Sequence, residues 1–282
     1  MTFKNQLLNY SRKIKVDNKN NLHFLICDKY DSEFFLCLHG QPTWSYIYRN
    51  FMNEFENRKL NFIVPDFIGF GLSDKPTDTS YFTFDQHRLN LITLLEELGI
   101  NKVNLICQDW GGIIGLTLPY NTKIVIEKLM VMNTILPELD FKLPQGFMDW
   151  KNWANANKEF KISKLMKRAC PGLSNEDLKN YDLPFEKNQS RCGTVCFPNL
   201  LEPMYSEKIE FFKNVKKYWT SQKPKKTCIV WGMKDPVFDH LVLERIKKIY
   251  IDSKTIEIKD GGHFVQEWSD KFLVEALDYL NE

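Results

Sequence analysis

The sequence predicts an α/β protein in which helices flank a mostly parallel central sheet and a helical cap is inserted into the chain. The first observation is a set of short apolar runs at residues 34–38, 62–64 and 103–107, each bounded by turn residues. Such runs are typical of strands buried on both faces. The second is a row of leucines at positions 91, 94, 95 and 98, which recur at helical spacing between the last two runs. Strands that alternate with helices form right-handed βαβ units, and so we expect parallel pairing.

The second half of the chain continues this pattern after an interruption. Further strand-like runs lie at residues 128–132, 226–231 and 255–258, and residues 270–280 have the pattern of a closing helix. From about Pro137 to Lys208 strands are hard to find, and prolines mark loops between aromatic and polar residues. We therefore expect a core of residues 1–136 and 209–282 and a helical cap of residues 137–208. The lysines between positions 208 and 226 fit a solvated connecting face.

Length and charge exclude several classes of protein. The 282 residues suit one large domain that carries an insertion. Lys and Arg number 38 and Asp and Glu 36, so the formal net charge of +2 favours neither nucleic acid nor a membrane surface as a partner. No apolar run approaches the roughly 20 residues that span a bilayer, and the first residues lack the apolar core of a signal peptide. We expect a cytoplasmic protein, with a monomer as the default.

The cysteines favour neither disulfides nor a metal site. There are seven, an odd number, and no CxxC pair occurs. Cys192 and Cys196 form a C-x3-C, but no His or Cys pair follows at a metal-ligand spacing. We therefore expect reduced thiols, no metal and no organic cofactor.

The segment from Leu105 to Gly115 carries the strongest chemical signal. It runs from a strand through a tight turn into a helix, with Asp109 at the turn and small residues on both sides of it. This small-x-nucleophile-x-small pattern is typical of a nucleophile elbow, which strains the central residue and points it into a cleft. A carboxylate there attacks a carbon that bears a leaving group and forms an alkyl ester, and it does not suit acyl transfer. The alternative is an aspartate that caps the following helix.

Three further segments can complete a catalytic triad and an oxyanion hole around Asp109. Gln41 follows the first central strand in a His-Gly turn, where its backbone N–H and that of Trp110 can form the oxyanion hole. His263 lies on a glycine loop after the last strand and can act as a general base. Asp235 ends the preceding strand and can hold the tautomer of His263. His263 and Asp235 each have an ordinary alternative, a structural histidine for the first and an Asx turn before proline for the second. The chain order is nevertheless nucleophile, acid, histidine.

Six stretches of the chain carry a resemblance to a known family. They are HGQPTWSYIYR (39–49), PDFIGFGLSDKP (65–76), QDWGG (108–112), GFMDWK (146–151), GMKD (232–235) and GGHFVQE (261–267). With these motifs the chain resembles the haloalkane dehalogenases of the α/β-hydrolase superfamily, and most of all the subgroup typified by the dichloroethane-degrading enzyme of Xanthobacter. QDWGG is shared with epoxide hydrolases, whereas the first stretch is far more specific. The resemblance implies an α/β-hydrolase fold and hydrolysis of a small apolar halogenated substrate to alcohol, halide and a proton.

The resemblance also implies which residues hold the departing halide. In the subgroup two indole N–H groups do so, one from the residue after the nucleophile, here Trp110, and one from the cap, here Trp150. Trp153 is the rival for the second position. Indole is a donor on an apolar ring, which suits a weakly hydrated halide in a dry pocket.

Other positions follow the family or depart from it. Gln41 stands where the subgroup usually has Glu, so any side-chain contact to the hydrolytic water is that of a neutral amide. Some relatives place the acid after the preceding strand, where this chain has Asn133 and no carboxylate, and this favours Asp235. Apolar pocket positions fall on Phe147, Phe197 and Val237.

Three other functions stay open on the sequence alone. An epoxide hydrolase would keep Asp109, Asp235 and His263 and add cap tyrosines, for which Tyr181 and Tyr205 are candidates. A luciferase-type oxygenase can reuse the same fold and triad. A non-catalytic hydrolase-like binding protein is the third, and the complete triad argues against it.

Overall fold

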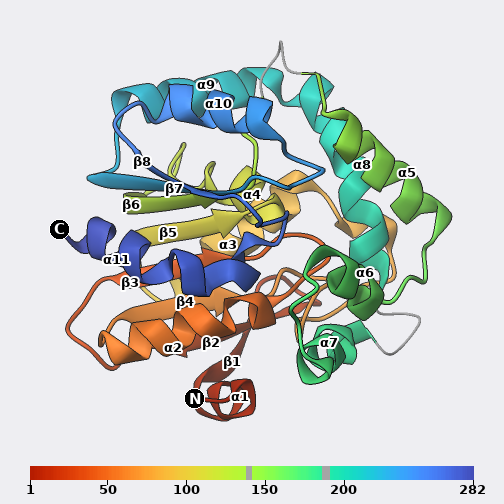
Figure 1. Ribbon diagram of the computed structural model, residues 1–282, viewed down its shortest axis with the longest axis horizontal. Helices are drawn as coiled ribbons and strands as arrows, with labels where there is room; N and C mark the ends of the chain where they lie inside the picture. The colour runs from red at the N-terminus through yellow and green to blue at the C-terminus, as the bar shows by residue number, and fades with distance from the viewer. Residues whose placement is uncertain (138–141, 186–190) are drawn as a thin grey trace.

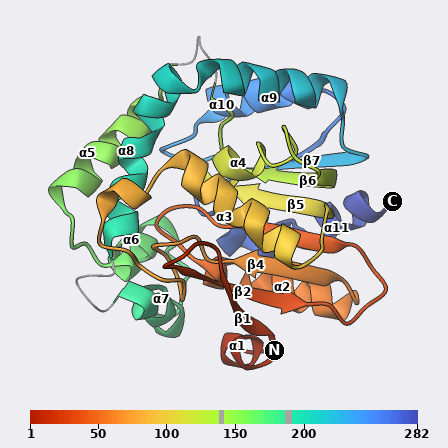
Figure 2. The same ribbon diagram turned by 180° about the vertical axis from the view of Figure 1, so that it is seen from behind.

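The computed structural model describes residues 1–137, 142–185 and 191–282 and shows a central sheet with helices on both faces (Figures 1 and 2). Within these residues eight strands form one sheet in the order β1-β2-β4-β3-β5-β6-β7-β8. Neighbours from β4 through β3 to β8 pair in parallel, whereas β1 pairs with β2 and β2 with β4 in antiparallel fashion. The expected mostly parallel sheet is therefore confirmed. The strands are β1 (Ser11–Lys15), β2 (Asn21–Cys27), β3 (Phe34–Leu38), β4 (Asn61–Pro65), β5 (Lys102–Gln108), β6 (Val125–Met132), β7 (Lys226–Gly232) and β8 (Lys254–Ile258).

Helices cover the sheet where the apolar periodicity predicts them. In α3 the side chains of Leu91, Leu94 and Leu95 are buried, and the Thr83 hydroxyl caps the helix by accepting from the Gln86 N–H. Helices α2 and α11 lie on one face of the sheet (Figure 1), and α3 and α9 lie on the other (Figure 2). The core helices are α1 (Phe3–Tyr10), α2 (Arg49–Asn57), α3 (Phe84–Glu97), α4 (Trp110–Gly115), α9 (Ile209–Ser221), α10 (His240–Ile249) and α11 (Leu273–Asn281).

The strands β1 and β2 were not predicted, although β2 carries a buried apolar run. Of these two strands, the apolar pattern is missing only from β1. Strand β1 reads Ser-Arg-Lys-Ile-Lys and is mostly exposed at the sheet edge. Positive side chains on an edge strand discourage pairing with a second chain. They also remove the apolar run by which a buried strand is recognised.

Four helices lie beyond the carboxyl ends of the parallel strands (Figure 1). They are α5 (Gln145–Ala156), α6 (Ile162–Ala169), α7 (Asn175–Asp182) and α8 (Cys192–Glu207). The expected cap of residues 137–208 also contains residues 138–141 and 186–190, which lie outside the described residues. None of the helices formed by the described residues has the length and apolar character needed to cross a bilayer.

A buried polar cluster, hereafter the cap anchor, joins α7 to the core. It consists of Tyr46, Arg49, Asp177, Tyr181 and Glu267. The Arg49 guanidinium donates to both Glu267 oxygens, at 2.8 and 2.7 Å, and lies 3.2 Å from Asp177. Tyr181 donates its hydroxyl proton to Glu267, and Tyr46 donates to Asp177 at 2.6 Å. The Arg49 and Glu267 side chains are only 13% and 3% exposed, so losing one partner would leave a buried charge at a cost of about 3–5 kcal/mol.

Candidate active site

Asp109 occupies a strained turn between β5 and α4. Its backbone angles are φ 51° and ψ −126°, and its side chain makes no capping hydrogen bond to the helix. The main-chain groups are held by neighbours, because the Asp109 N–H donates to the Asn133 carbonyl at 3.0 Å and the Thr134 hydroxyl donates to the Asp109 carbonyl at 2.6 Å. A Cβ at Gly111 would collide with the Leu38 carbonyl, so only glycine lets the helix approach the strand. The turn has the geometry of a nucleophile elbow, and the helix-capping alternative is wrong.

The two carboxylate oxygens of Asp109 have different surroundings. Oδ1 accepts the Gln41 backbone N–H at 2.8 Å, and the Trp110 backbone N–H also donates to this carboxylate. Oδ2 lies 3.6 Å from Nε2 of His263. One oxygen is thus fixed by backbone donors, while the other lies beside a histidine.

His263 and Asp235 form the other half of the predicted set. Nδ1 of His263 lies 2.9 Å from Oδ2 of Asp235. Oδ1 of Asp235 accepts the Val237 N–H at 2.7 Å, and Oδ2 also accepts from the Asn133 amide at 2.8 Å. These contacts satisfy the buried carboxylate and keep Nδ1 of His263 protonated, which leaves Nε2 as an acceptor on the side of Asp109.

Burial and mutual charge shift the two titrating groups. Burial raises the pKa of Asp109 above its usual value, against the opposing effects of His263 and of the backbone N–H groups of Trp110 and Gln41. For His263, burial disfavours the charged form, but the Asp235 charge, its hydrogen bond and the Asp109 charge together outweigh burial and raise the pKa. The raised pKa makes His263 a stronger base, while its charge and the two backbone N–H groups limit the rise in the pKa of Asp109.

Two polar residues of the site were not singled out as functional by the sequence. Asn133 connects the elbow to the acid, since its carbonyl holds the Asp109 N–H and its amide holds Asp235. Gln108 donates to the His263 carbonyl at 3.1 Å, and its Nε2 lies 3.2 Å from Nε2 of His263. The position of Gln108 next to the nucleophile was the one available signal.

A cavity of about 740 Å³ adjoins Asp109 and is lined by residues of the core and of the cap. Of the residues predicted from the sequence, Gln41, Asp109, Trp110, Phe147, Trp150, Val237 and His263 line it. Asp235 lies behind His263. Phe197 is fully buried and does not line the cavity, because its ring packs against that of Trp110 with centroids 5.0 Å apart.

The two predicted halide donors are both at the cavity, but their N–H groups differ. Among the described residues none accepts from the Trp110 indole N–H, which leaves this donor free beside Asp109. The Trp150 indole donates to Oε1 of Gln41 at 3.0 Å, and Nε2 of Gln41 donates to the Thr194 carbonyl at 2.8 Å. Trp153 stacks on Trp150 with centroids 5.5 Å apart. Gln41 therefore links the oxyanion position to helices α5 and α8.

The two cap tyrosines that an epoxide hydrolase would need are not at the cavity. Tyr181 is fully buried and donates to Glu267 in the cap anchor. Tyr205 is not among the residues that line the space next to Asp109. Neither hydroxyl can therefore reach a substrate oxygen in this arrangement.

Comparisons with known proteins cover both core and cap. A family model described as alpha/beta hydrolase fold matches residues 33–270. The haloalkane dehalogenase of Psychrobacter cryohalolentis is 30% identical over 257 residues, 89% of this chain and 84% of that protein. That of Mycolicibacterium paratuberculosis is 27% identical over 262 residues, 91% of this chain and 86% of that protein. The structure of the tetrameric haloalkane dehalogenase DpaA of Paraglaciecola agarilytica superimposes with a TM-score of 0.89 at 29% identity, over 96% of this chain and 93% of that chain.

These likenesses agree with the geometry at Asp109. They favour neither an epoxide hydrolase nor a non-catalytic binding protein, and the chain catalyses the hydrolytic dehalogenation of haloalkanes. The chain belongs to the α/β-hydrolase fold family and, within it, to the haloalkane dehalogenases, hydrolases that act on carbon–halogen bonds.

Proposed function

We propose that dehalogenation proceeds through an alkyl ester on Asp109. Oδ2 attacks the carbon that bears the halogen, a C–O bond forms, and the C–halogen bond breaks with its electron pair leaving on the halide. The observation that carries this proposal is that the two carboxylate oxygens of Asp109 have different surroundings. Because the Gln41 backbone N–H holds Oδ1, the direction of the other oxygen is fixed.

The ester is then hydrolysed with His263 as the base. Nε2 of His263 takes a proton from water, and the water oxygen attacks Cγ of Asp109. Oδ1 becomes the oxyanion and already accepts from the Gln41 backbone N–H, and the Trp110 backbone N–H, which donates to the same carboxylate, is the second donor of the proposed oxyanion hole. Asp235 stabilises the charged His263. Collapse of the intermediate releases the alcohol with Oδ2 and leaves the water oxygen in the carboxylate.

A single turnover in water enriched in oxygen-18 tests this sequence of steps. With enzyme in excess over butyl bromide, we expect unlabelled butanol, because its oxygen comes from Asp109, and one heavy oxygen in the Asp109 peptide. Mass spectrometry of both products measures the label. Labelled butanol with an unlabelled Asp109 would mean direct attack by water and would overturn the ester.

The pH dependence of ester hydrolysis follows from the charges around His263. A protonated His263 cannot accept a proton, so the hydrolysis rate falls as the pH drops through its pKa. The Asp109 charge helps to raise that pKa in the free enzyme, and alkylation removes the charge. We therefore expect the acid limb of single-turnover hydrolysis at a lower pH than the NMR titration of His263 in the free enzyme. In an Asp109→Asn variant the pKa of His263 measured by NMR should also be lower than in the free wild-type enzyme. If this pKa, the wild-type pKa and the acid limb of hydrolysis all coincide, the argument is wrong.

We also propose that Trp110 and Trp150 bind the departing halide, with the larger contribution from Trp110. Trp110→Phe removes a free donor aimed at developing charge and should lower kcat/KM for butyl bromide by about 10²-fold or more. Trp150→Phe should lower kcat/KM by less, because the Trp150 indole N–H already donates to Gln41. Trp153→Phe is the matched control, as it removes an indole from the same cavity. A larger loss for Trp153 than for Trp150 would reverse the assignment.

The proposal extends to the subgroup, to the division into core and cap, and to the residues that contact the substrate. The Xanthobacter-type subgroup is supported by HGQPTWSYIYR (39–49) and by Trp150 at the cavity. The division into core and cap is supported by α5 to α8, and Phe147 and Val237 are placed to contact the substrate. The monomer and the cytoplasmic location stay predictions. The tetrameric relative speaks against the monomer, and light scattering of the purified protein measures its mass directly.

A further inference from the structure

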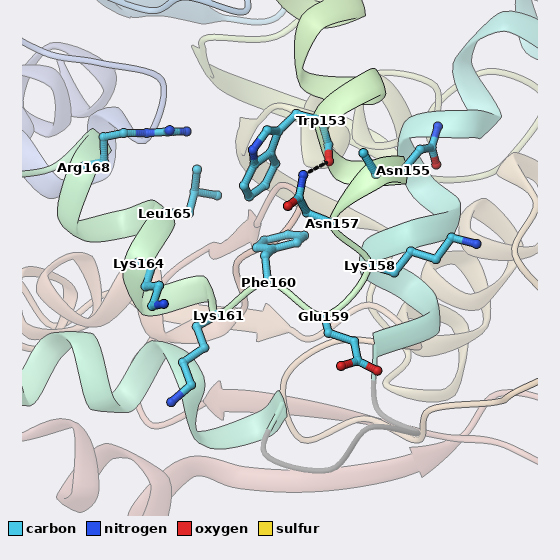
Figure 3. A pocket seen from close by; sticks show the side chains of 11 residues that line it. Trp153, Asn155, Asn157, Lys158, Glu159, Phe160, Lys161, Lys164, Leu165 and Arg168 are labelled. Atoms are coloured by element: carbon cyan, nitrogen blue, oxygen red, sulfur yellow. Dashed lines mark hydrogen bonds between the residues drawn. The ribbon is translucent and has the colours of Figure 1, made fainter.

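A second hollow adjoins the cavity of Asp109 on the cap. It has a volume of about 840 Å³ and is lined by residues of α5, of α6 and of the segment between them (Figure 3). Trp153, Leu165 and Arg168 line both spaces. These three side chains form the boundary between the two spaces, and a ligand that spans both must pass them.

Most of the charged side chains around this hollow are positive. Lys158, Lys161, Lys164 and Arg168 line it together with a single carboxylate, Glu159. Lys161, Lys164 and Arg168 recur at helical spacing, so one edge of α6 carries three cations (Figure 3). The whole chain has a formal net charge of only +2, so this is a local concentration of charge.

Within the described residues none of these four cations is in an ion pair, so no paired carboxylate neutralises the charge that faces the hollow. Such pairs do occur elsewhere on the surface, as between Lys208 and Asp85. The Arg168 guanidinium instead lies over the Trp153 ring, 5.8 Å from its centroid. When a guanidinium stacks on an indole, its N–H groups remain available to bind a planar anion such as a carboxylate.

We propose that the hollow binds the carboxylate end of an ω-haloalkanoate while its halogenated end reaches Asp109. This substrate class rests on the proposed function and narrows it. The two ends must be far apart, because Asp109 is itself an anion and repels a nearby carboxylate. Long-chain ω-haloalkanoates are therefore good substrates, and short ones such as bromoacetate are poor.

The test compares each acid with its methyl ester, which has the same chain without the charge. For ω-bromooctanoate we expect wild-type kcat/KM to exceed that of the ester by roughly tenfold at low salt, with the preference declining as salt is added. Lys161→Glu combined with Lys164→Glu should reverse the preference and leave kcat/KM for the ester within about twofold, because neither residue lines the cavity of Asp109. Lys102→Glu combined with Lys123→Glu makes the same charge change near the amino ends of β5 and β6, and should alter neither the preference nor the rate with the ester. Arg168→Gln should remove part of the preference.

The possible failures are distinguishable. If wild type dehalogenates the ester and butyl bromide but treats acid and ester alike, the substrate class is wrong and the dehalogenase mechanism stands. The same holds if Lys102→Glu with Lys123→Glu lowers the preference as much as Lys161→Glu with Lys164→Glu, because the effect would then come from net charge. If no substrate releases halide, the proposed function fails and this inference fails with it.

Discussion

A His263→Phe variant is expected to stop at the alkyl ester, with one halide released per enzyme and almost no further turnover. Phe fills the buried ring position beside Phe238 and Phe264, so the cavity keeps its shape. The variant has no base for water, and loss of a general base costs about 10²–10⁴-fold. The first step needs only Asp109 and the halide donors, and it should survive.

Mass spectrometry provides the measurement. After incubation with butyl bromide, the peptide that contains Asp109 should carry one butyl group in the variant and none in wild type at steady state. The double variant with Asp109→Asn should carry none. An unmodified variant, with a wild type that releases halide normally, would mean that Asp109 is not the nucleophile or that His263 is needed for the first step.

Asp109→Asn should abolish halide release. The amide oxygen can still accept the Gln41 and Trp110 backbone N–H groups, and Asn tolerates a positive φ better than most residues, so the fold should persist. The nucleophilic charge is lost, and we expect kcat/KM for butyl bromide to fall on the order of 10⁴-fold or more.

Asp149→Asn is the matched control for this variant. Asp149 is a carboxylate on the cap side of the same cavity, and its loss should leave kcat/KM within about twofold. Bromide inhibition of wild type and bromide binding to Asp109→Asn should remain similar, which shows that the halide site is intact. Equal losses in the two variants would point to the charge of the cavity and not to a nucleophile.

The convergence of the triad could be predicted because it depends on chain order alone. Gln41, Asp109, Asp235 and His263 each follow the end of a strand, and the carboxyl ends of parallel strands meet at one edge of the sheet. No contact between side chains had to be known. The same argument explains why Asn133, after β6, joins the group.

Contacts made by the cap could not be predicted in the same way. The hydrogen bond from Trp150 to Gln41 depends on how α5 rotates over the core, and the packing of Phe197 against Trp110 depends on α8. Neither helix has a periodic signal that fixes its rotation. From the sequence alone, the indole N–H of a cap tryptophan could therefore be free or could already donate to another side chain.

The cap anchor connects helix α7 to the segment that carries His263. Glu267 lies on the short helical turn Val265–Lys271, which begins two residues after His263, and the same carboxylate holds Arg49 and Tyr181. Lifting α7 would therefore strain the peptide that positions the imidazole. If substrate entry required α7 to move, His263 would be displaced in every catalytic cycle. The cap anchor therefore favours passage of substrate and product with α7 held in place.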